Sequence, residues 1–588
     1  MVPRSIILLL IWRYILNRRQ RQRRVKKRGG LFRRLLGLVI IAAAAYWVVF
    51  YVLPNRLHTD PDWKGLEQPV FVKGELTGYS ASGTGDALLL PLPLLQKYVD
   101  SSIRYEEDTK SVILSTDNEL LYMQEDTKTA SLNNTPLQLR LAPEEKNGVT
   151  YLPADTLENL YGFEVEENKD TGAVLLMTAG ETVPLGKVKG EEDGKTQPLR
   201  SEATIHAPIV ADMSPGTVVR IWNADNEDWL YVQMDSGFTG YVKANDIIKG
   251  GEKAVDAKPA TPSRAERSWK GKPVNLYWEA VYERKPNPAK FGSLPGVNVV
   301  SPTWFEIVDI NGNVRSKADS AYVQWAHQQG MEVWGLLTNS FNADLTTQAL
   351  SSYEKRMNAI VQMLEYADLY GLDGINIDFE NVYTKDGENV TQFMRELKPM
   401  AQAKNLIVSM DVTPKSNSEM WSLFLDRRAL GAVTDFLIVM AYDEHWASSP
   451  TAGSVASLPW VEKSVSRILE EDDVPAEKLI LGIPLYTRIW SETTKDGKTK
   501  VSSKAVSMNA VQEILAEKKL KPVLDKDSGQ NYVEYTEDGV LRKIWIEDKV
   551  SLKARVELAK SFGLGGIGSW NRSFAVPEAW ETLQQISE

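Results

Sequence analysis

The C-terminal half of the chain alternates short apolar runs with amphipathic stretches. One amphipathic stretch, 351–371, keeps its apolar residues on a single stripe and ends at Gly371, a pattern that predicts a helix with a glycine stop. Eight strand–helix units in about 315 residues predict a (β/α)8 barrel over 274–588, with a polar, β-rich insertion at about 491–546. The apolar runs that predict its strands are residues 274–281, 297–304, 332–339, 374–380, 406–412, 436–443, 479–486 and 566–571.

An uncharged run of nineteen residues, LLGLVIIAAAAYWVVFYVL (35–53), follows a basic segment, 1–34, with twelve Lys and Arg and no acid. As a helix this run would span about 28 Å at roughly 1.5 Å per residue, close to the thickness of a bilayer core. Because basic residues stay on the cytoplasmic side, the run predicts one transmembrane helix with a cytoplasmic N-terminus. Residues 54–588 would then lie on the extracellular, wall-facing side.

Two other interpretations of this N-terminal region are a cleaved signal peptide and a nucleic-acid-binding arm. Ala43 and Ala45 could form a cleavage site, but apolar residues continue for eight positions beyond them, which favours an uncleaved anchor. A basic arm beside such a helix is more simply a topology signal that also attracts anionic lipid. We therefore expect a membrane contact and no nucleic-acid partner.

The region after a short polar stalk, 54–68, contains an internal repeat. Segments 90–114 and 152–176 align without gaps, and each combines an opening Leu-Pro, a central Asp-Thr and a closing apolar run. Each predicts a short helix followed by a hairpin, within an α+β domain at 69–190. This domain resembles the small domain named after the N-terminal part of copper amine oxidases, found in many wall-associated bacterial proteins. No copper is implied, since the ligands are missing, and we expect a packing and positioning role.

Residues 194–249 show short β-rich runs separated by turns. Gly216, Gly237 and Gly240 stand at expected bends, and Trp229 precedes an alternating strand, so the region predicts a small β-barrel. It resembles bacterial SH3-like domains, whose members often bind cell-wall peptide or glycan. Trp229 and Tyr241 are more often core residues than ligand platforms. The charged, Gly- and Pro-containing stretch 250–273 predicts a linker between modules.

Composition narrows the chemistry that the chain can support. It has no cysteine and only four histidines, far apart in sequence, so no metal-ligand spacing and no disulfide scaffold is present. Beyond residue 34, 56 Lys and Arg against 78 Asp and Glu give a formal charge of −22. Because anionic wall polymers would repel such a surface, a grip on wall glycan would use stacking and hydrogen bonds. The oligomeric state stays open.

The fourth predicted strand, in GLDGINIDFENV (371–382), is unusual for a buried strand. Strand alternation places Asn376, Asp378 and Glu380 on one face and apolar side chains on the other. Polar groups at the C-terminal ends of barrel strands build active sites. Carboxylates about 6–7 Å apart in a poorly solvated mouth raise one pKa, which leaves a protonated acid for glycoside cleavage. A structural ion-pair cluster is the alternative.

Three more predicted strands also end in polar or aromatic residues, which makes a chance cluster at the fourth strand less plausible. These are Tyr442 and Asp443 after the sixth strand, Tyr486 and Arg488 after the seventh, and Trp570 at the end of the eighth.

With these residues in view, 274–588 resembles glycoside hydrolase family 18, the chitinase family. The fourth-strand motif DGxDxDxE departs at Asn376, where most chitinases have aspartate; asparagine also occurs there in the branch that resembles spore-cortex and cell-wall N-acetylglucosaminidases. The departure puts proton cycling between two aspartates in doubt, but an asparagine can still hydrogen-bond Asp378. The residues that match the family's motifs are Asp373, Gly374, Asp378, Glu380, Met440, Tyr442, Asp443 and Trp570.

The resemblance implies substrate-assisted, retaining catalysis without a metal or organic cofactor. Glu380 would protonate the leaving oxygen and later activate water, while the substrate's own 2-acetamido oxygen attacks the anomeric carbon. Asp378 would orient the acetamido N–H, and Tyr442 would hydrogen-bond its oxygen. Asp443 would contact the sugar and Trp570 would form the floor of the −1 subsite. The other expected substrate-binding residues are Tyr277, Asn376, Met440, Tyr486, Arg488 and Trp446.

Further aromatic residues are candidates for additional sugar subsites. Strand-end positions are favoured, while about half of the set is expected in the core. The candidates are Tyr277, Trp278, Trp304, Trp334, Trp446 and Trp490.

The leading hypothesis is a membrane-anchored hydrolase of the β-1,4 bond after N-acetylglucosamine in peptidoglycan. Chitin is the alternative substrate. A catalytically silent glycan-binding scaffold of the wall is the non-enzymatic alternative, which the presence of Glu380 disfavours.

Overall fold

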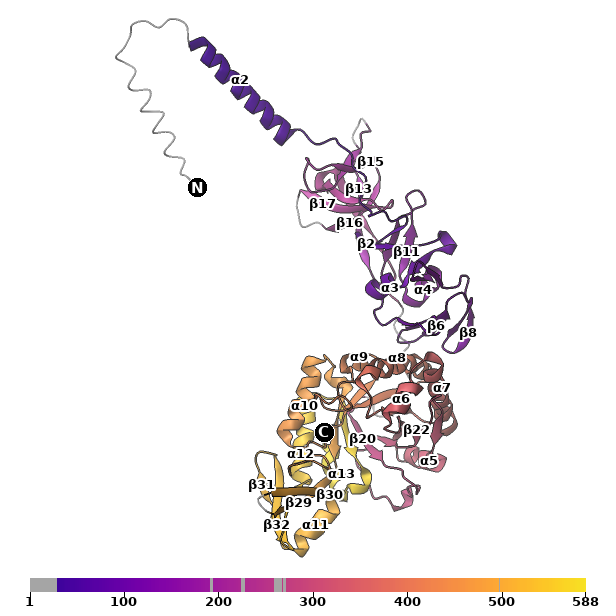
Figure 1. Cartoon of the computed structure of the whole chain (residues 1–588), viewed down its shortest axis with the longest axis vertical. Helices are drawn as coiled ribbons and strands as arrows, with labels where there is room; N and C mark the ends of the chain where they lie inside the picture. The colour runs from indigo at the N-terminus through magenta and orange to yellow at the C-terminus, as the bar shows by residue number, and fades with distance from the viewer. Residues whose placement is uncertain (1–28, 191–193, 224–227, 259–266, 268–270, 496–497) are drawn as a thin grey trace, which may run out of the picture. The chain divides into compact units, whose positions relative to one another are not determined.

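The structure is a computed structural model that describes residues 29–190, 194–223, 228–258, 267, 271–495 and 498–588. The chain divides into two compact units (Figure 1). The first combines the described residues before 86 with 163–257, and the second combines 86–162 with 258–588.

The second unit contains a closed barrel of eight parallel strands. Hydrogen bonds between β20 and β34 and between β21 and β24 complete the ring. Each strand lies within one of the eight apolar runs, so the predicted barrel is confirmed. Its strands are β20 (Val274–Glu279), β21 (Val299–Pro302), β24 (Glu332–Thr338), β25 (Gly374–Asp378), β26 (Ile407–Val412), β27 (Phe436–Val439), β28 (Leu479–Pro484) and β34 (Gly566–Trp570).

Helices surround this ring (Figure 1). The longest, α7 (Tyr353–Tyr370), ends at Gly371 in the left-handed conformation, as the sequence predicted. The other helices around the barrel are α5 (Ser320–Gln328), α6 (Ala343–Ala349), α8 (Gly387–Ala403), α9 (Arg427–Ala432), α10 (Leu458–Glu471), α12 (Lys549–Ser561) and α13 (Pro577–Leu583).

Alternate residues of the strands pack in two separate layers. One apolar cluster, which includes Leu276, Trp278 and Trp334, fills the barrel interior, whereas Ile375 and Ile377 belong to the larger cluster between strands and helices. This alternation turns the polar residues of β25 inward, toward the barrel axis.

An antiparallel sheet with one helix is inserted between β28 and α12. It begins at Tyr486, slightly before the expected insertion at 491–546, and its strand order is β30-β29-β33-β32-β31. A shorter hairpin, β22 (Phe305–Ile307) with β23 (Val314–Ser316), follows β21. The inserted elements are β29 (Tyr486–Lys495), β30 (Lys498–Ser507), α11 (Met508–Glu517), β31 (Val523–Asp525), β32 (Gln530–Glu537) and β33 (Val540–Ile546).

Both copies of the internal repeat fold as predicted, a short helix and then a hairpin. Each is preceded by a strand, and these two strands pair antiparallel with Leu90 opposite Leu152, the residues that the repeat equates. The pairing therefore relates these two opening strands by a local pseudo-twofold axis. The first copy is β3 (Leu89–Pro91), α3 (Leu92–Tyr98), β4 (Arg104–Glu106) and β5 (Ser111–Ser115); the second is β10 (Val149–Pro153), α4 (Ala154–Tyr161), β11 (Glu164–Glu167) and β12 (Val174–Met177).

The two hairpins join different sheets, a difference that the repeat did not predict. The first extends into a five-stranded sheet of the second unit, and the second pairs with the first strands of the first unit. The added strands are β6 (Leu120–Gln124), β7 (Thr129–Leu132) and β8 (Thr135–Gln138) in one sheet, and β1 (Pro69–Val72) and β2 (Glu75–Ser80) in the other; β9 (Glu144–Lys146) pairs with β10.

The first unit also contains a seven-stranded antiparallel sheet. Trp229 and Tyr241 are half-buried in it. Gly240 lies inside a strand and not at the expected bend. Glycine is needed there because a Cβ would lie 2.4 Å from the carbonyl oxygen of Arg200. The likeness to SH3 domains stays a prediction. The strands are β13 (Thr182–Val188), β14 (Gln197–Arg200), β15 (Ile209–Met213), β16 (Val218–Asn223), β17 (Trp229–Met234), β18 (Thr239–Lys243) and β19 (Ile247–Ala254).

The segment expected to be a stalk, 54–68, pairs with this sheet. The backbone N–H of Ile209 donates to Leu57, and the N–H of Thr59 donates to Ile209. These bonds hold part of the segment against the seven-stranded sheet.

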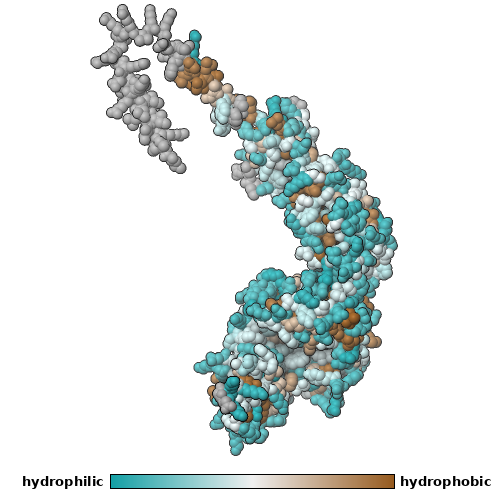
Figure 2. Space-filling view, in the orientation of Figure 1, coloured by the Kyte–Doolittle hydropathy of each residue, from teal (hydrophilic) through white to brown (hydrophobic). Residues whose placement is uncertain are grey.

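The N-terminal helix α2 (Gly29–Trp47) runs into a π-helical turn, Val48–Val52. Its apolar side chains, such as Leu38 and Ile41, are exposed. Figure 2 shows hydrophobic surface over this helix. No helix among the residues with a described placement is long and apolar enough to cross a bilayer, so the structure does not support the anchor predicted at 35–53. Residues 1–28 of the basic segment lie outside the described residues.

Candidate active site

Strand β25 carries three polar side chains at increasing distance from the barrel interior. Asn376 is fully buried, Asp378 is 7 % exposed, and Glu380, two residues past the strand end, is half-buried. The predicted alternation is therefore confirmed, because Ile375 and Ile377 lie in the outer apolar layer. Glu380 is the member of this row with the most access to solvent.

Glu380 is held in place through its backbone. Asn339, directly after β24, accepts from the N–H of Glu380 at 3.1 Å and donates through Nδ2 to its carbonyl oxygen at 2.8 Å. Asn339 is fully buried and also donates to Oγ1 of Thr346 on α6. This clamp fixes the backbone of the acid relative to the neighbouring strand. We did not single out Asn339 from the sequence, although its position as a polar residue at a strand end was a usable signal.

Burial and neighbouring acids raise the pKa values of both carboxyl groups of this row. Burial, with the charges of Asp378 and Asp443, raises the pKa of Glu380 well above its usual range. Burial, with the charge of Asp411, does the same for the pKa of Asp378, which accepts a hydrogen bond from Glu380. The arrangement therefore favours a protonated Glu380 near neutral pH, which is what a general acid needs.

Tyr442 and Asp443, after β27, lie beside this row. Burial raises the pKa of Tyr442 well above its usual range, as do the nearby Asp411 and Tyr486, so its hydroxyl remains a hydrogen-bond donor. Asp443 Oδ1 accepts from the hydroxyl of Tyr486 at 2.5 Å and from Arg488 Nη2 at 3.2 Å. Both partners come from β29, so the structure brings these four predicted residues together.

Trp570, the last residue of β34, is half-buried and packs edge-on against Trp278 with ring centroids 6.0 Å apart. Its ring therefore lies at the boundary between the apolar barrel interior and the open end. That position suits a hydrophobic floor beneath a bound ring. Met440, the residue directly after β27, is also half-buried.

Asp373 and Gly374 lie at the opposite end of β25 from Glu380. Asp373 Oδ2 is 2.8 Å from His327 Nε2 and accepts from the N–H of Val333 at 2.9 Å, which ties β25 to β24. A Cβ at Gly374 would lie 2.7 Å from Trp334. Both motif residues therefore shape the barrel and do not contact the acid.

Several predicted sugar-binding residues do not reach the open end. Tyr277 is fully buried and faces the helix layer, where its ring packs against Trp580. Trp490 is 1 % exposed and donates to the carbonyl oxygen of Gly453, so neither side chain can stack on a sugar. Trp278, Trp304 and Trp334 are likewise buried, whereas Trp446 is 51 % exposed and remains available.

Asn376 also differs from its expected role. It is fully buried beneath Asp378, and its Nδ2 donates to Asp411 at 2.9 Å and not to Asp378. Asp411, on the neighbouring strand β26, was not singled out from the sequence. An acid inside the apolar run LIVSMDV was the available signal.

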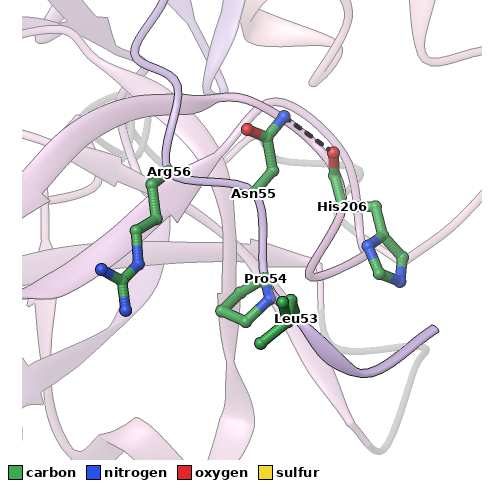
Figure 3. Close-up of a pocket in the computed structure, with 5 residues that line it drawn as sticks. All are labelled: Leu53, Pro54, Asn55, Arg56 and His206. Carbon is green, nitrogen blue, oxygen red and sulfur yellow. Dashed lines mark hydrogen bonds between the residues drawn. The ribbon is translucent and has the colours of Figure 1, made fainter. Parts of the chain in front are cut away.

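Two other features do not add chemistry to the site. The pocket in Figure 3 belongs to the first unit, and its lining, Leu53, Pro54, Asn55, Arg56 and His206, contains no acid. Within the part of the chain that the structure describes, no three His, Cys, Asp or Glu residues are grouped to hold a metal ion.

A parallel eight-stranded barrel that carries a carboxyl of raised pKa, a second carboxyl and a tyrosine hydroxyl at the ends of two of its strands has the groups that a barrel glycosidase needs. Comparison with known families agrees: residues 341–575 match the model of the glycosyl hydrolases family 18. The chain therefore contains a glycoside hydrolase family 18 domain, and the enzyme class predicted from the sequence is confirmed. Residues 80–176 match the copper amine oxidase N-terminal domain, which confirms the second resemblance.

Similar proteins include bacterial and animal enzymes. The cortical fragment-lytic enzyme of Bacillus anthracis is 27 % identical over 46 % of this chain and 64 % of its own length. The di-N-acetylchitobiase of Mus musculus is 25 % identical over 43 % of this chain and 74 % of its own length. Among solved structures, the chitinase of Chromobacterium violaceum shares 23 % identity with a TM-score of 0.47, covering 53 % of this chain and 98 % of that one. The chain thus spans less than two thirds of the Bacillus anthracis enzyme.

Proposed function

We propose that this protein hydrolyses the β-1,4 bond after N-acetylglucosamine in peptidoglycan, by retaining, substrate-assisted catalysis. The observation that carries the proposal is the position of Glu380 beside Asp378 and Tyr442 at the C-terminal end of the barrel strands, where burial and the neighbouring acids raise its pKa. The cell-wall substrate is supported by the relative named a cortical fragment-lytic enzyme.

In the proposed reaction Glu380 donates its proton to the glycosidic oxygen as the bond to the anomeric carbon breaks. The carbonyl oxygen of the substrate's 2-acetamido group forms the new bond to that carbon, so no protein nucleophile is required. Asp378 accepts from the acetamido N–H, and the hydroxyl of Tyr442 donates to the acetamido oxygen. Glu380, now ionised, takes a proton from water, whose oxygen opens the intermediate with overall retention.

Other residues would position the sugar. Asp443, held by Tyr486 and Arg488, has a partly exposed carboxylate that can accept from a sugar hydroxyl. Trp570 would lie under the ring, and the exposed Trp446 could stack on a neighbouring sugar.

The test is to digest purified wall and to reduce the fragments. N-Acetylglucosamine at the new reducing ends is expected, whereas N-acetylmuramic acid there would eliminate the glucosaminidase assignment. Glu380→Gln keeps the shape of the side chain but has no proton to give, so release should fall by at least about a hundredfold. Wall that has been chemically de-N-acetylated should resist the unaltered enzyme, because the nucleophile is gone.

Chitin is the second candidate substrate, favoured by the relative named di-N-acetylchitobiase. Soluble chitooligosaccharides measured beside wall glycan separate the two proposals. A higher kcat/KM on chitooligosaccharides would replace the peptidoglycan assignment and leave the catalytic residues unchanged.

Membrane anchoring with the barrel on the wall side is proposed on the sequence alone, from the uncharged run 35–53 and the basic segment before it. We also propose that the seven-stranded sheet is an SH3-like module that binds wall. Fractionation of cells that express the full chain, beside a variant lacking residues 1–53, tests the first. Wall pull-down by Glu380→Gln with and without residues 182–254 tests the second.

A further inference from the structure

A second buried acid lies next to the catalytic row and has no role in the proposed reaction. Asp411 is the fifth residue of β26 and only 2 % of its surface is exposed. Its carboxyl lies within hydrogen-bond distance of Asn376, the deepest polar residue of β25. Burying an ionised carboxylate without a cation beside it costs free energy, so the groups around Asp411 must account for its burial.

The orientation of Asn376 is fixed by its other contacts. Its Oδ1 accepts from Trp278 Nε1 at 3.0 Å and from Ser301 Oγ at 2.9 Å. The amide nitrogen must therefore face Asp411, to which it donates at 2.9 Å. A reversed amide would place Nδ2 against the Trp278 donor, so this arrangement is unambiguous.

The titratable groups that face Asp411 are acids and a phenol. They are Asp378 and Glu380 from the end of β25 and Tyr442 after β27; among the described residues, no lysine or arginine is one of the main influences on the pKa of its carboxyl. Burial raises the pKa of Asp411 well above its usual range, and the nearby Glu380 adds to this while Asn376 opposes it. The side chain of Asp378 has one buried oxygen, Oδ1, without a hydrogen-bond partner among the described residues.

We propose that Asp411, on the fifth barrel strand, is a positioning residue whose carboxyl shares one proton with the carboxyl of Asp378. This is a second proton in the active site, in addition to the one on Glu380. This inference rests on the proposed function. Two ionised carboxylates in one dry interior repel each other, and a shared proton reduces the buried charge from two to one. The pairing of β25 with β26 sets Asn376 opposite Ser409 and Ile377 opposite Met410, so Asp411 is the next residue along β26 and lies level with Asp378.

The shared proton has a defined course in the reaction. In the free enzyme it lies between Asp378 and Asp411. When the substrate presents its acetamido N–H, the O–H bond to Asp378 breaks and the O–H bond to Asp411 forms, which leaves Asp378 ionised as the acceptor. The proton returns to Asp378 when product leaves, so no proton is gained or lost by the pair.

Asp411→Asn tests the proposal with soluble N-acetylated glycan strands, released from wall by an amidase, as the probe. The variant keeps the shape and can accept from Asn376, but it cannot hold the proton. We expect kcat to fall about ten- to a hundredfold, with less change in KM. Because the charge of Asp411 raises the pKa of Asp378, the acidic limb of the kcat/KM profile should move to lower pH by about one unit.

The exchange variant Asn376→Asp/Asp411→Asn is the sharper test. It moves the acid to residue 376, where Trp278 and Ser301 still donate and the new amide can donate across the same gap. We expect it to regain at least about a tenth of the original kcat and to return the acidic limb toward its original position. Ser409→Ala, a buried change two residues earlier on β26, is the matched control and should leave the pH profile unchanged.

The outcomes separate this inference from the proposed function. An unaltered enzyme that does not cleave wall glycan removes the proposed function itself. Cleavage that is lost in Glu380→Gln but unchanged, with an unshifted profile, in Asp411→Asn overturns only the role of Asp411. If Asp411→Asn does not fold in a thermal unfolding assay, the exchange variant decides alone, and a kcat below a tenth of the original overturns the inference.

Discussion

The clamp that Asn339 places on Glu380 gives the most direct test of how the fold positions its acid. Asn339→Ala removes four hydrogen bonds: two to the backbone of Glu380, one to Thr346 and one from the N–H of Phe341. At about 0.5–1.5 kcal/mol each, their loss should lower the free energy of unfolding by about 2–6 kcal/mol. The same change removes the two hydrogen bonds that hold the backbone of Glu380 in place.

The expected kinetic effect follows from geometry. A displacement of the Glu380 carboxyl by about 1 Å should lower kcat by about a hundredfold, equivalent to about 2.7 kcal/mol in the barrier. KM should change much less, since Asn339 is fully buried and cannot contact substrate. The assay is steady-state cleavage of soluble wall glycan, with urea unfolding measured on the same preparation.

Asn342→Ala is a matched control three residues further along the chain. Asn342 caps α6 by accepting from the N–H of Leu345 at 3.0 Å, so its loss should cost about 1 kcal/mol of stability without a change in kcat. A folded Asn339→Ala protein with kcat within threefold of the original would refute the idea that this clamp positions the acid.

Three further predictions follow from charges and hydrogen bonds. Because the pKa of Glu380 is raised, activity should fall only as pH rises through that pKa, where the acid loses its proton. Asp443→Asn removes a partly exposed negative charge that helps to raise this pKa. In a pH–rate profile it should move the alkaline limb to lower pH by less than about one unit. Tyr486→Phe removes the hydroxyl that donates to Asp443 and should raise KM by about three- to tenfold with little change in kcat. Arg356→Ala deprives Glu396, fully buried, of its guanidinium partner and should lower the free energy of unfolding by about 3–5 kcal/mol in urea titrations.

Each of these predictions has a contrary outcome. An alkaline limb that moves upward in Asp443→Asn would contradict the charge argument. Equal losses in kcat and kcat/KM for Tyr486→Phe would indicate a role in the transition state instead of in binding.

The loss of unfolding free energy in Arg356→Ala should also depend on pH in a defined direction. Burial already raises the folded-state pKa of Glu396 above its unfolded value, so its contribution to stability is present at low pH and lost as pH rises. Without Arg356 that pKa rises further, and the destabilisation should be larger at about pH 8 than at about pH 5. A loss that does not vary with pH would show that the removed charge is not what matters.

The sequence by itself determined the parts of this protein that depend on local periodicity. Alternation along 374–380 separated Asp378 and Glu380 from the apolar face, and the eight apolar runs became the eight barrel strands. The repeat likewise predicted two helix–hairpin units. A period of two or of 3.6 residues is a property of one element, so it can be recognised before any packing is known.

Tertiary structure decided which elements meet. The contacts of Asn376 with Asp411, and of Asn339 with Glu380, join neighbouring strands that are distant in sequence, and nothing in one strand's pattern specifies its lateral partner. The same holds for Tyr277, which occupies a strand end but faces the helix layer. Whether a polar or aromatic side chain serves chemistry or the core therefore depends on the register between strands, which only the closed barrel establishes.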